Sequence, residues 1–246
     1  MSTIQINDAK APDSVSNEPR VIVALDFDDL LSVKNLVSRL DPSLCRLKIG
    51  KELFTSCGPV VVELVQGMGF DVFLDLKFHD IPATTAKACK AASNLGVWMV
   101  NVHALGGQRM LEASREAVNE SSNKTKLIAV TILTSHDQVE INNVGLHNDI
   151  DDQVSLLAKL AFDAGLDGVV CSARETKRLR NSFGDDFLLV TPGIRPSGVA
   201  LNDQKRAVTP VEAVLNGSSY LVIGRPITQA KDPVQVLLDI NSSISN

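Results

Sequence analysis

Short apolar segments alternate with amphipathic segments along most of this chain. The apolar segments predict eight strands, at residues 21–25, 44–49, 72–76, 98–102, 127–132, 168–171, 187–190 and 220–223. Between them, apolar residues recur at the spacing of one helix face, as in Val33, Leu36, Val37 and Leu40. Strands that alternate with helices are typical of β-α-β units, which build a parallel sheet.

The number of these units selects the fold class. Eight units within about 230 residues predict an α/β protein, a single-domain (β/α)8 TIM barrel that occupies residues 19–246. Residues 1–18 are polar, and we expect them to form a disordered tail. The alternative is a doubly wound open sheet. That fold places a glycine-rich turn after its first strand, whereas Leu25-Asp26-Phe27-Asp28 stands here.

The composition of the chain says little about its fold, but it excludes several classes of binding partner. Of the residues, 44% are apolar and 22% are charged, as in an ordinary soluble globular protein. The net charge of −5 and the absence of a long Lys/Arg run argue against nucleic-acid binding. No apolar run approaches the roughly 18 residues of a membrane span, and the first residues do not resemble a signal peptide. The four cysteines form no CxxC pair, which favours buried free thiols in the cytoplasm.

The most informative segment is Asp75-Leu76-Lys77-Phe78-His79-Asp80-Ile81-Pro82-Ala83-Thr84, which directly follows a predicted strand. Residues two apart on a strand share a face, so Asp75 and Lys77 should project side by side. We expect Pro82 to end the extended segment and Thr84 to cap the next helix. Asp80 lies between them, and its position favours an orientation away from its own pocket, towards a neighbouring subunit.

Polar residues also follow the other predicted strands, and in a barrel these strand ends converge. Asp26, Lys48, Asn101, His103 and Thr134 occupy such positions. Lys48, Asp75 and Lys77 lie on adjacent strands and alternate in sign, so each charge would offset its neighbour. Carboxylates beside Lys77 favour its charged form, which suits a proton donor better than a Schiff-base nucleophile.

A phosphate site is predicted after the last two strands. There the chain reads Thr191-Pro192-Gly193-Ile194-Arg195-Pro196-Ser197-Gly198 and Ile223-Gly224-Arg225-Pro226-Ile227-Thr228. Barrels commonly bind phosphate at these two loops. Both glycines allow a close approach of the backbone, and Arg225 can clamp two phosphate oxygens. The alternative is that Gly-Arg-Pro is only a tight turn.

Two loops are long in the sequence pattern. Residues 136–152 predict a long polar loop after the fifth strand, and residues 193–205 predict a lid over the site. His79, His136 and His147 have no partner at the spacing of a metal site, so the sequence predicts no metal.

These motifs, in this order, resemble the orotidine 5′-monophosphate decarboxylase family, in its bacterial form, from Val21 to about Pro233. The matching motifs are Ala24-Leu25-Asp26, Leu47-Lys48-Ile49-Gly50, Asp75-x-Lys77-x-x-Asp80-Ile81-Pro82-x-Thr84, Thr191-Pro192-Gly193-Ile194-Arg195 and Ile223-Gly224-Arg225. The resemblance implies a lyase that converts orotidine 5′-monophosphate to UMP and CO2 in de novo pyrimidine biosynthesis. It also implies a homodimer that uses no metal and no organic cofactor.

The resemblance also assigns roles to residues. Asp26 would bind ribose or uracil-side hydroxyls, Lys48 would join the charged network, Asp75 would face the substrate carboxylate, and Lys77 would protonate C6. Thr134 would bind the pyrimidine. Phosphate and the closed lid would be held by Arg195, Gln204, Gly224 and Arg225. Asp80, Ile81 and Thr84 would complete the partner subunit's site.

Two other functions compete with this one. The metal-dependent sugar-phosphate lyases and decarboxylases share the Asp-x-Lys-x-x-Asp motif, but they carry an acidic metal ligand where this chain has Lys48. A lysine at that position opposes a divalent cation. A barrel that only senses a phosphate ligand would not need the alternating lysines and aspartates, all of which are present here.

Overall fold

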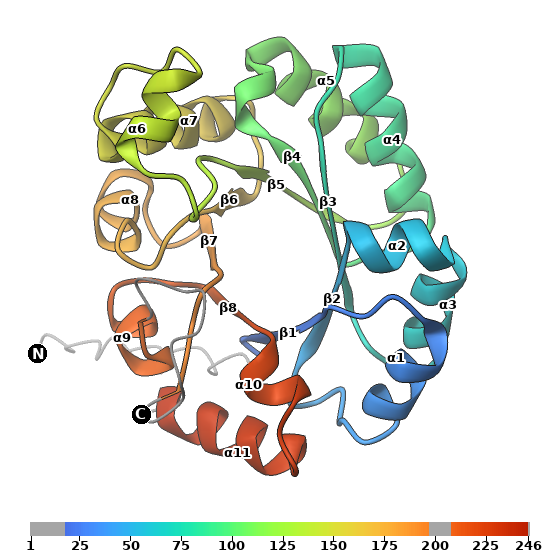
Figure 1. Ribbon diagram of the computed structural model, residues 1–246. Coiled ribbons are helices and arrows are strands. Elements are labelled where there is room, and N and C mark those ends of the chain that lie inside the picture. The colour runs from blue at the N-terminus through green and yellow to red at the C-terminus, as the bar shows by residue number, and fades with distance from the viewer. Residues whose placement is uncertain (1–17, 197–207, 246) are drawn as a thin grey trace, which may run out of the picture.

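The computed structural model describes residues 18–196 and 208–245 and shows a ring of strands surrounded by helices (Figure 1). Residues 1–17, most of the predicted lid and Gln204 lie outside the described residues. The strands are β1 (Val21–Leu25), β2 (Arg46–Gly50), β3 (Val72–Phe78), β4 (Met99–His103), β5 (Lys126–Val130), β6 (Gly168–Val170), β7 (Leu188–Thr191) and β8 (Tyr220–Ile223). All pair in parallel, and β1 pairs with β8, which closes the barrel. The predicted (β/α)8 fold is confirmed, and the open sheet is excluded.

Alternate residues of the strands fill the inside of the barrel. An inner apolar layer contains Ile22, Phe73, Met99, Ile128 and Val190, all essentially inaccessible to solvent. The residues between them face outwards and pack under the helices in a larger core. Since both faces of each strand are covered, the strands read as continuous apolar runs in the sequence.

The helices surround this barrel (Figure 1). They are α1 (Leu30–Val37), α2 (Lys51–Cys57), α3 (Val60–Gly67), α4 (Pro82–Asn94), η1 (Ala104–Gly106), α5 (Gln108–Asn119), α6 (Gln138–Asn143), α7 (Ile150–Asp163), α8 (Thr176–Phe183), α9 (Pro210–Leu215), α10 (Arg225–Thr228) and α11 (Pro233–Ile244). None of these helices is long and apolar enough to span a membrane.

Two local predictions were wrong. Thr84 does not cap α4: the helix begins at Pro82, with Ile81 as its N-cap residue. Proline fits this first position because it has no N–H that would need a partner. Residues 136–152 are also not a plain loop, since they contain α6. The Asp137 side chain accepts from the backbone N–H of Glu140, whose own side chain accepts from Asp137 N–H. This capping box stabilises a helix too short to show an apolar period.

The amino-terminal end of the barrel is closed by a buried arginine. Arg46 is only 4% exposed, and its guanidinium carbon lies 4.2 Å from the centre of the Trp98 ring. It forms ion pairs with Asp71 at 3.1 Å and Glu18 at 3.0 Å, and it donates to the Pro19 carbonyl. A bulky ionic plug therefore fills this end, and the cavity described below opens at the other.

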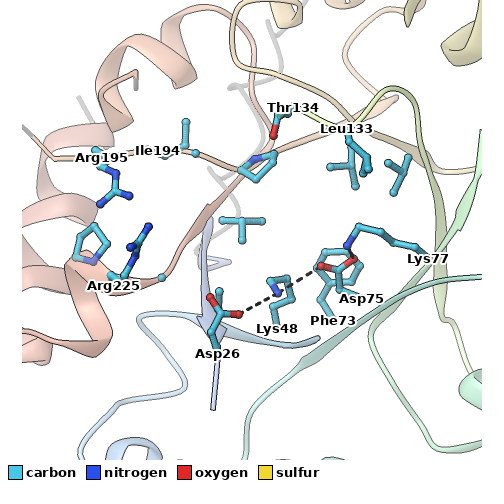
Figure 2. Close-up of a pocket in the computed structure, with 18 of the residues that line it drawn as sticks. Asp26, Lys48, Phe73, Asp75, Lys77, Leu133, Thr134, Ile194, Arg195 and Arg225 are labelled. Atoms are coloured by element: carbon cyan, nitrogen blue, oxygen red, sulfur yellow. Dashed lines mark hydrogen bonds and ion pairs between the residues drawn. The ribbon is translucent and has the colours of Figure 1, made fainter. Parts of the chain in front are cut away.

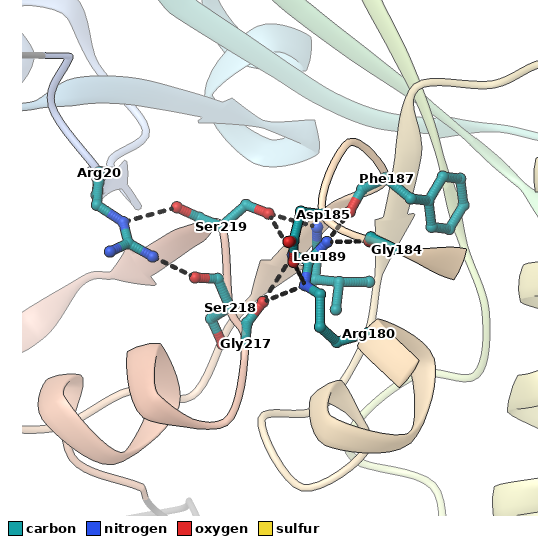
Figure 3. A network of polar contacts seen from close by, with 9 residues as sticks. All are labelled: Arg20, Arg180, Gly184, Asp185, Phe187, Leu189, Gly217, Ser218 and Ser219. Atoms are coloured by element: carbon teal, nitrogen blue, oxygen red, sulfur yellow. Dashed lines mark hydrogen bonds and ion pairs between the residues drawn. The ribbon is translucent and has the colours of Figure 1, made fainter. Parts of the chain in front are cut away.

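A second network ties together the loops that enter β7, β8 and β1 (Figure 3). Arg180 donates to the carbonyls of Gly217, Gly184 and Phe187 and to the Ser219 hydroxyl. Arg20 donates to the carbonyls of Ser218 and Ser219. The Arg20 contacts join residues about 200 apart in the sequence, so they hold the closing seam of the barrel from its amino-terminal end.

The four thiols are free. Cys45, Cys89 and Cys171 are buried as expected, and burial raises the pKa of Cys45 to about 12 and that of Cys89 to about 11. Cys57 is only half-buried, because it lies in the last turn of a surface helix.

Candidate active site

A cavity of about 300 Å³ opens at the carboxyl ends of the strands (Figure 2). This volume is at the lower end of the range for small-molecule sites. Residues from seven of the eight strands, or from the loops that follow them, line it: Ala24, Asp26, Lys48, Phe73, Asp75, Lys77, Val130, Ile132, Leu133, Thr134, Val170, Pro192, Gly193, Ile194, Arg195, Val222, Gly224, Arg225 and Pro226.

One wall of the cavity carries a row of alternating charges. Lys48 Nζ lies 3.7 Å from Asp26 Oδ1 and 3.4 Å from Asp75 Oδ2. Lys77 Nζ lies 2.5 Å from the other oxygen of Asp75. The Lys48 and Asp75 side chains are each 12% exposed, whereas that of Asp26 is 65% exposed. The structure therefore brings together the four charges that the sequence predicted at adjacent strand ends.

Asp75 is held as a carboxylate at the centre of this row. Burial alone would raise its pKa, but the charges of Lys48 and Lys77 and the hydrogen bonds from Lys77 and Asn101 outweigh burial and lower the pKa. A buried carboxylate with a cation on each oxygen is fixed in direction. It can in turn fix Lys77 Nζ at one point of the cavity.

The opposite part of the cavity is arranged for an anion. Figure 2 shows Arg195 and Arg225 together, across the cavity from Lys77. Arg195 is buried at 7% exposure. Gly224 lies against Asp26, since a Cβ added there would come within 3.4 Å of an Asp26 carboxylate oxygen. Two guanidinium groups and close backbone at one end suit a phosphate.

Apolar side chains and Thr134 separate the two charged ends. Ile132, Leu133 and Pro192 line the cavity, and Thr134 lies at the rim in Figure 2. These apolar lining residues could not be predicted from the sequence, because the residue type alone does not distinguish an apolar residue that lines a cavity from one in the core. The apolar side chains of this middle part can pack against a ring.

Three residues of the motif do not line the cavity of their own chain. Asp80, Ile81 and Thr84 are all exposed, with Ile81 at 66%. Asp80 Oδ1 accepts from the Ile81 N–H at 2.6 Å, and the Asp80 backbone N–H is bonded to the Thr85 hydroxyl. They form a surface patch beside the mouth instead.

His103 lies at the end of β4, outside the cavity lining. Its Nδ1 is buried with no hydrogen-bond partner in the described part of the chain, and its ring centre is 5.7 Å from that of His79. Burial, followed by the charges of His79, Lys51 and Lys77, lowers its pKa to about 4. It is therefore neutral near pH 7. In residues 18–196 and 208–245, no group of three or more His, Cys, Asp or Glu side chains could hold a metal ion.

Comparison with known proteins places this chain in a family. Residues 19–240 match the model of the Orotidine 5'-phosphate decarboxylase / HUMPS family. The chain belongs to this family. Its relatives include the Orotidine 5'-phosphate decarboxylase of Nitrosospira multiformis, which is 60% identical over 230 residues, covering 94% of this chain and 95% of the relative. The Orotidine 5'-phosphate decarboxylase of Vibrio cholerae is 55% identical over 229 residues, which cover 93% of this chain and 99% of that relative.

A solved structure of the family has the same fold. The crystal structure of Orotidine 5'-phosphate decarboxylase from Lactobacillus acidophilus is 40% identical, with a TM-score of 0.82 over 93% of this chain and all of that one. The Asp75-x-Lys77-x-x-Asp80 motif and the loops after β7 and β8 lie within the stretch that the family model covers.

Proposed function

We propose that this protein is a carboxy-lyase that converts orotidine 5′-monophosphate to UMP and CO2 in de novo pyrimidine biosynthesis. The observation that carries the proposal is a single cavity with the Lys48–Asp75–Lys77 row at one end and Arg195 and Arg225 at the other. One ligand with a reacting carboxylate and a remote phosphate accounts for both ends. The names of the relatives agree with this substrate.

Lys77 is the proposed proton donor. Loss of CO2 from C6 leaves an electron pair in the plane of the ring, where the ring cannot delocalise it. An ammonium that Asp75 already fixes stabilises that charge without reorganisation and then transfers its proton to C6. Asp75 would lie beside the departing carboxylate, and Lys48 balances its charge from the other side.

The remaining residues bind the parts of the substrate that do not react. Arg195, Gly224, Arg225 and Gln204 would hold the phosphate and the closed lid, Thr134 the pyrimidine, and Asp26 the ribose or uracil-side hydroxyls. Binding energy from the remote phosphate can be used to organise the charged row. The reaction as proposed needs no metal or organic cofactor, because Lys77 supplies both the charge and the proton.

The exposed patch of Asp80, Ile81 and Thr84 supports a homodimer. An isoleucine that is 66% exposed beside the mouth of the cavity is suited to burial against a second copy. In that dimer, these three residues would complete the partner's site. Mixing Lys77→Ala chains with Asp80→Ala chains tests this arrangement: shared sites predict that the mixture recovers part of the activity that each variant lacks alone. A mixture as inactive as its components would contradict shared sites.

The first experiment is to follow the ultraviolet absorbance of orotidine 5′-monophosphate with purified protein and excess EDTA. Rapid conversion to UMP is the expected result. No conversion in EDTA, together with magnesium-dependent activity on a sugar phosphate, would place the protein with the metal-dependent lyases. Inactivity in both assays would leave a phosphate-binding barrel.

A further inference from the structure

Asn101 is buried in the middle of β4 and contacts both members of the Asp75–Lys77 pair. It is 0% exposed. Its Nδ2 donates to Asp75 Oδ1 at 2.7 Å, and its Oδ1 accepts from the backbone N–H of Lys77 at 2.8 Å. Asp75 Oδ1 is the same oxygen that accepts from Lys77 Nζ. One amide group therefore closes a ring of contacts around the carboxylate and the lysine.

The backbone at Lys77 explains why such a contact is needed. Lys77 has φ of +53°, the only positive φ of a non-glycine residue in the described chain. Pairing of β3 with β4 is interrupted there, since Leu74 pairs with Val100 and Phe78 pairs with Val102. Three residues of β3 thus lie opposite Asn101 alone. A left-handed backbone conformation is unfavourable for lysine, and it persists only where the surrounding structure enforces it.

We propose that Asn101 is a positioning residue that sets the direction of Asp75 and the left-handed backbone of Lys77 together. The inference rests on the proposed decarboxylation, in which Lys77 Nζ must lie at C6. Asparagine is the suitable residue because it offers a donor and an acceptor on one planar group. Leucine would offer neither, and aspartate at neutral pH would offer only acceptors.

An Asn101→Asp substitution separates the two contacts. The new carboxylate keeps an acceptor for the Lys77 N–H but replaces the donor to Asp75 with a like charge. The charged groups around it would be Asp75 and Lys77 on β3 and Lys48 on β2, while the adjacent β5 residue, Ile128, is apolar. On β4 itself, His103 is two residues away. Beyond this row, the groups whose charge acts on His103 are His79 and Lys51.

Two buried carboxylates side by side favour uptake of one proton. A protonated carboxyl at position 101 has one donor and one acceptor, as the amide does. We therefore expect the activity of Asn101→Asp, relative to the wild type at each pH, to rise as the pH falls from about 8 to about 5. Asn101→Ala cannot regain a donor, so its relative activity should stay flat across this range.

The experiment measures kcat and KM for orotidine 5′-monophosphate with the wild type, both Asn101 variants and Thr125→Val. Thr125 is the matched control because it is also buried and forms two side-chain hydrogen bonds, with Val97 and Ser93, away from the cavity. We expect Asn101→Ala to lower kcat about 100-fold, as for a misplaced catalytic group, while KM changes little because the phosphate end is intact. Thr125→Val should melt at a lower temperature and keep its kcat.

Each outcome decides the matter. A kcat of Asn101→Ala within about threefold of the wild type, or a flat pH ratio for Asn101→Asp, would overturn the positioning role. If Asn101→Ala does not fold, the isosteric Asn101→Asp variant carries the test by itself. A wild type that fails to decarboxylate would refute the proposed function instead. A crystal structure of the Asn101→Asp variant at neutral pH would then decide the inference: an unchanged contact between Lys77 Nζ and Asp75 would overturn it, and a separated pair would support it.

Discussion

Glu175 provides a pH-dependent test of the structure outside the catalytic row. It lies in the loop between β6 and α8, where its Oε2 accepts from the Ser172 N–H at 2.8 Å. It also lines a second cavity of about 350 Å³ next to the first. Burial, together with the charge of Asp151, raises the pKa of Glu175 from 4.5 to about 7, although the bond from Ser172 opposes this.

The direction in which stability changes with pH follows from how many protons the folded and unfolded states bind. Since the pKa is higher in the folded protein, the folded state binds more protons than the unfolded state between about pH 4.5 and 7. Stability is therefore lost as the pH rises through this range, and the full cost is present above about pH 7. The difference between the two pKa values corresponds to about 3 kcal/mol at 1.36 kcal/mol per pH unit.

Glu175→Gln should remove this cost and keep an acceptor for the Ser172 N–H. At about pH 8 the variant should be more stable by up to about 3 kcal/mol, or about 6–12 °C in Tm for a domain of this size, and at about pH 4.5 the gain should vanish. Thermal unfolding at both pH values measures it. Glu116→Gln, on an exposed face of α5, is the control. It should not change the difference between the Tm measured at the higher pH and the Tm measured at the lower pH. An equal gain for Glu175→Gln at both pH values would refute the reasoning.

Three further substitutions test the site and the barrel. Lys77→Ala should lower kcat by at least about 1,000-fold with the fold retained in circular dichroism, and near-normal turnover would contradict its role as proton donor. Arg225→Ala should raise KM about 10- to 100-fold, as for a lost charged hydrogen bond, and also lower kcat through poorer closure; an unchanged KM would contradict the phosphate assignment. Gly168→Ala should lower the free energy of unfolding by at least about 2 kcal/mol in urea titrations, because its Cβ would lie 2.1 Å from the Leu188 carbonyl oxygen; wild-type stability would show that the two strands can separate.

Much of the fold could be predicted because local and global signals agree. The first strand, Val21–Leu25, is apolar throughout and buried throughout, so its bounds were predicted correctly. The third strand runs two residues further than predicted, because Phe78 pairs again with Val102 of β4 after the irregular backbone at Lys77. The short helix α6 was missed because only Ile141 is buried in it, although the Asp137 and Glu140 capping pair was visible in the sequence.

The site could be predicted only as far as charge reveals it. Lys48, Asp75 and Lys77 stand out because charged residues at the ends of buried strands are costly. Asn101 was noticed merely as a polar residue at a strand end. Its role depends on the irregular pairing of β3 with β4, and no residue type in the sequence predicts that irregularity. Gly224 and Arg225, by contrast, could be picked out from the sequence, because they directly follow the apolar residues of β8.

Because β1 pairs with β8, the barrel of a newly made chain cannot close until β8 has been synthesised. The two strands are separated by about 200 residues, which a ribosome needs roughly 10–40 s to synthesise. Throughout that interval one edge of β1 has no strand beside it. Because β1 consists of five consecutive apolar residues, this open edge can pair with strands of other chains. Translation that stops before Tyr220 would leave this edge open permanently. We expect such fragments to aggregate rather than to form a barrel of seven strands.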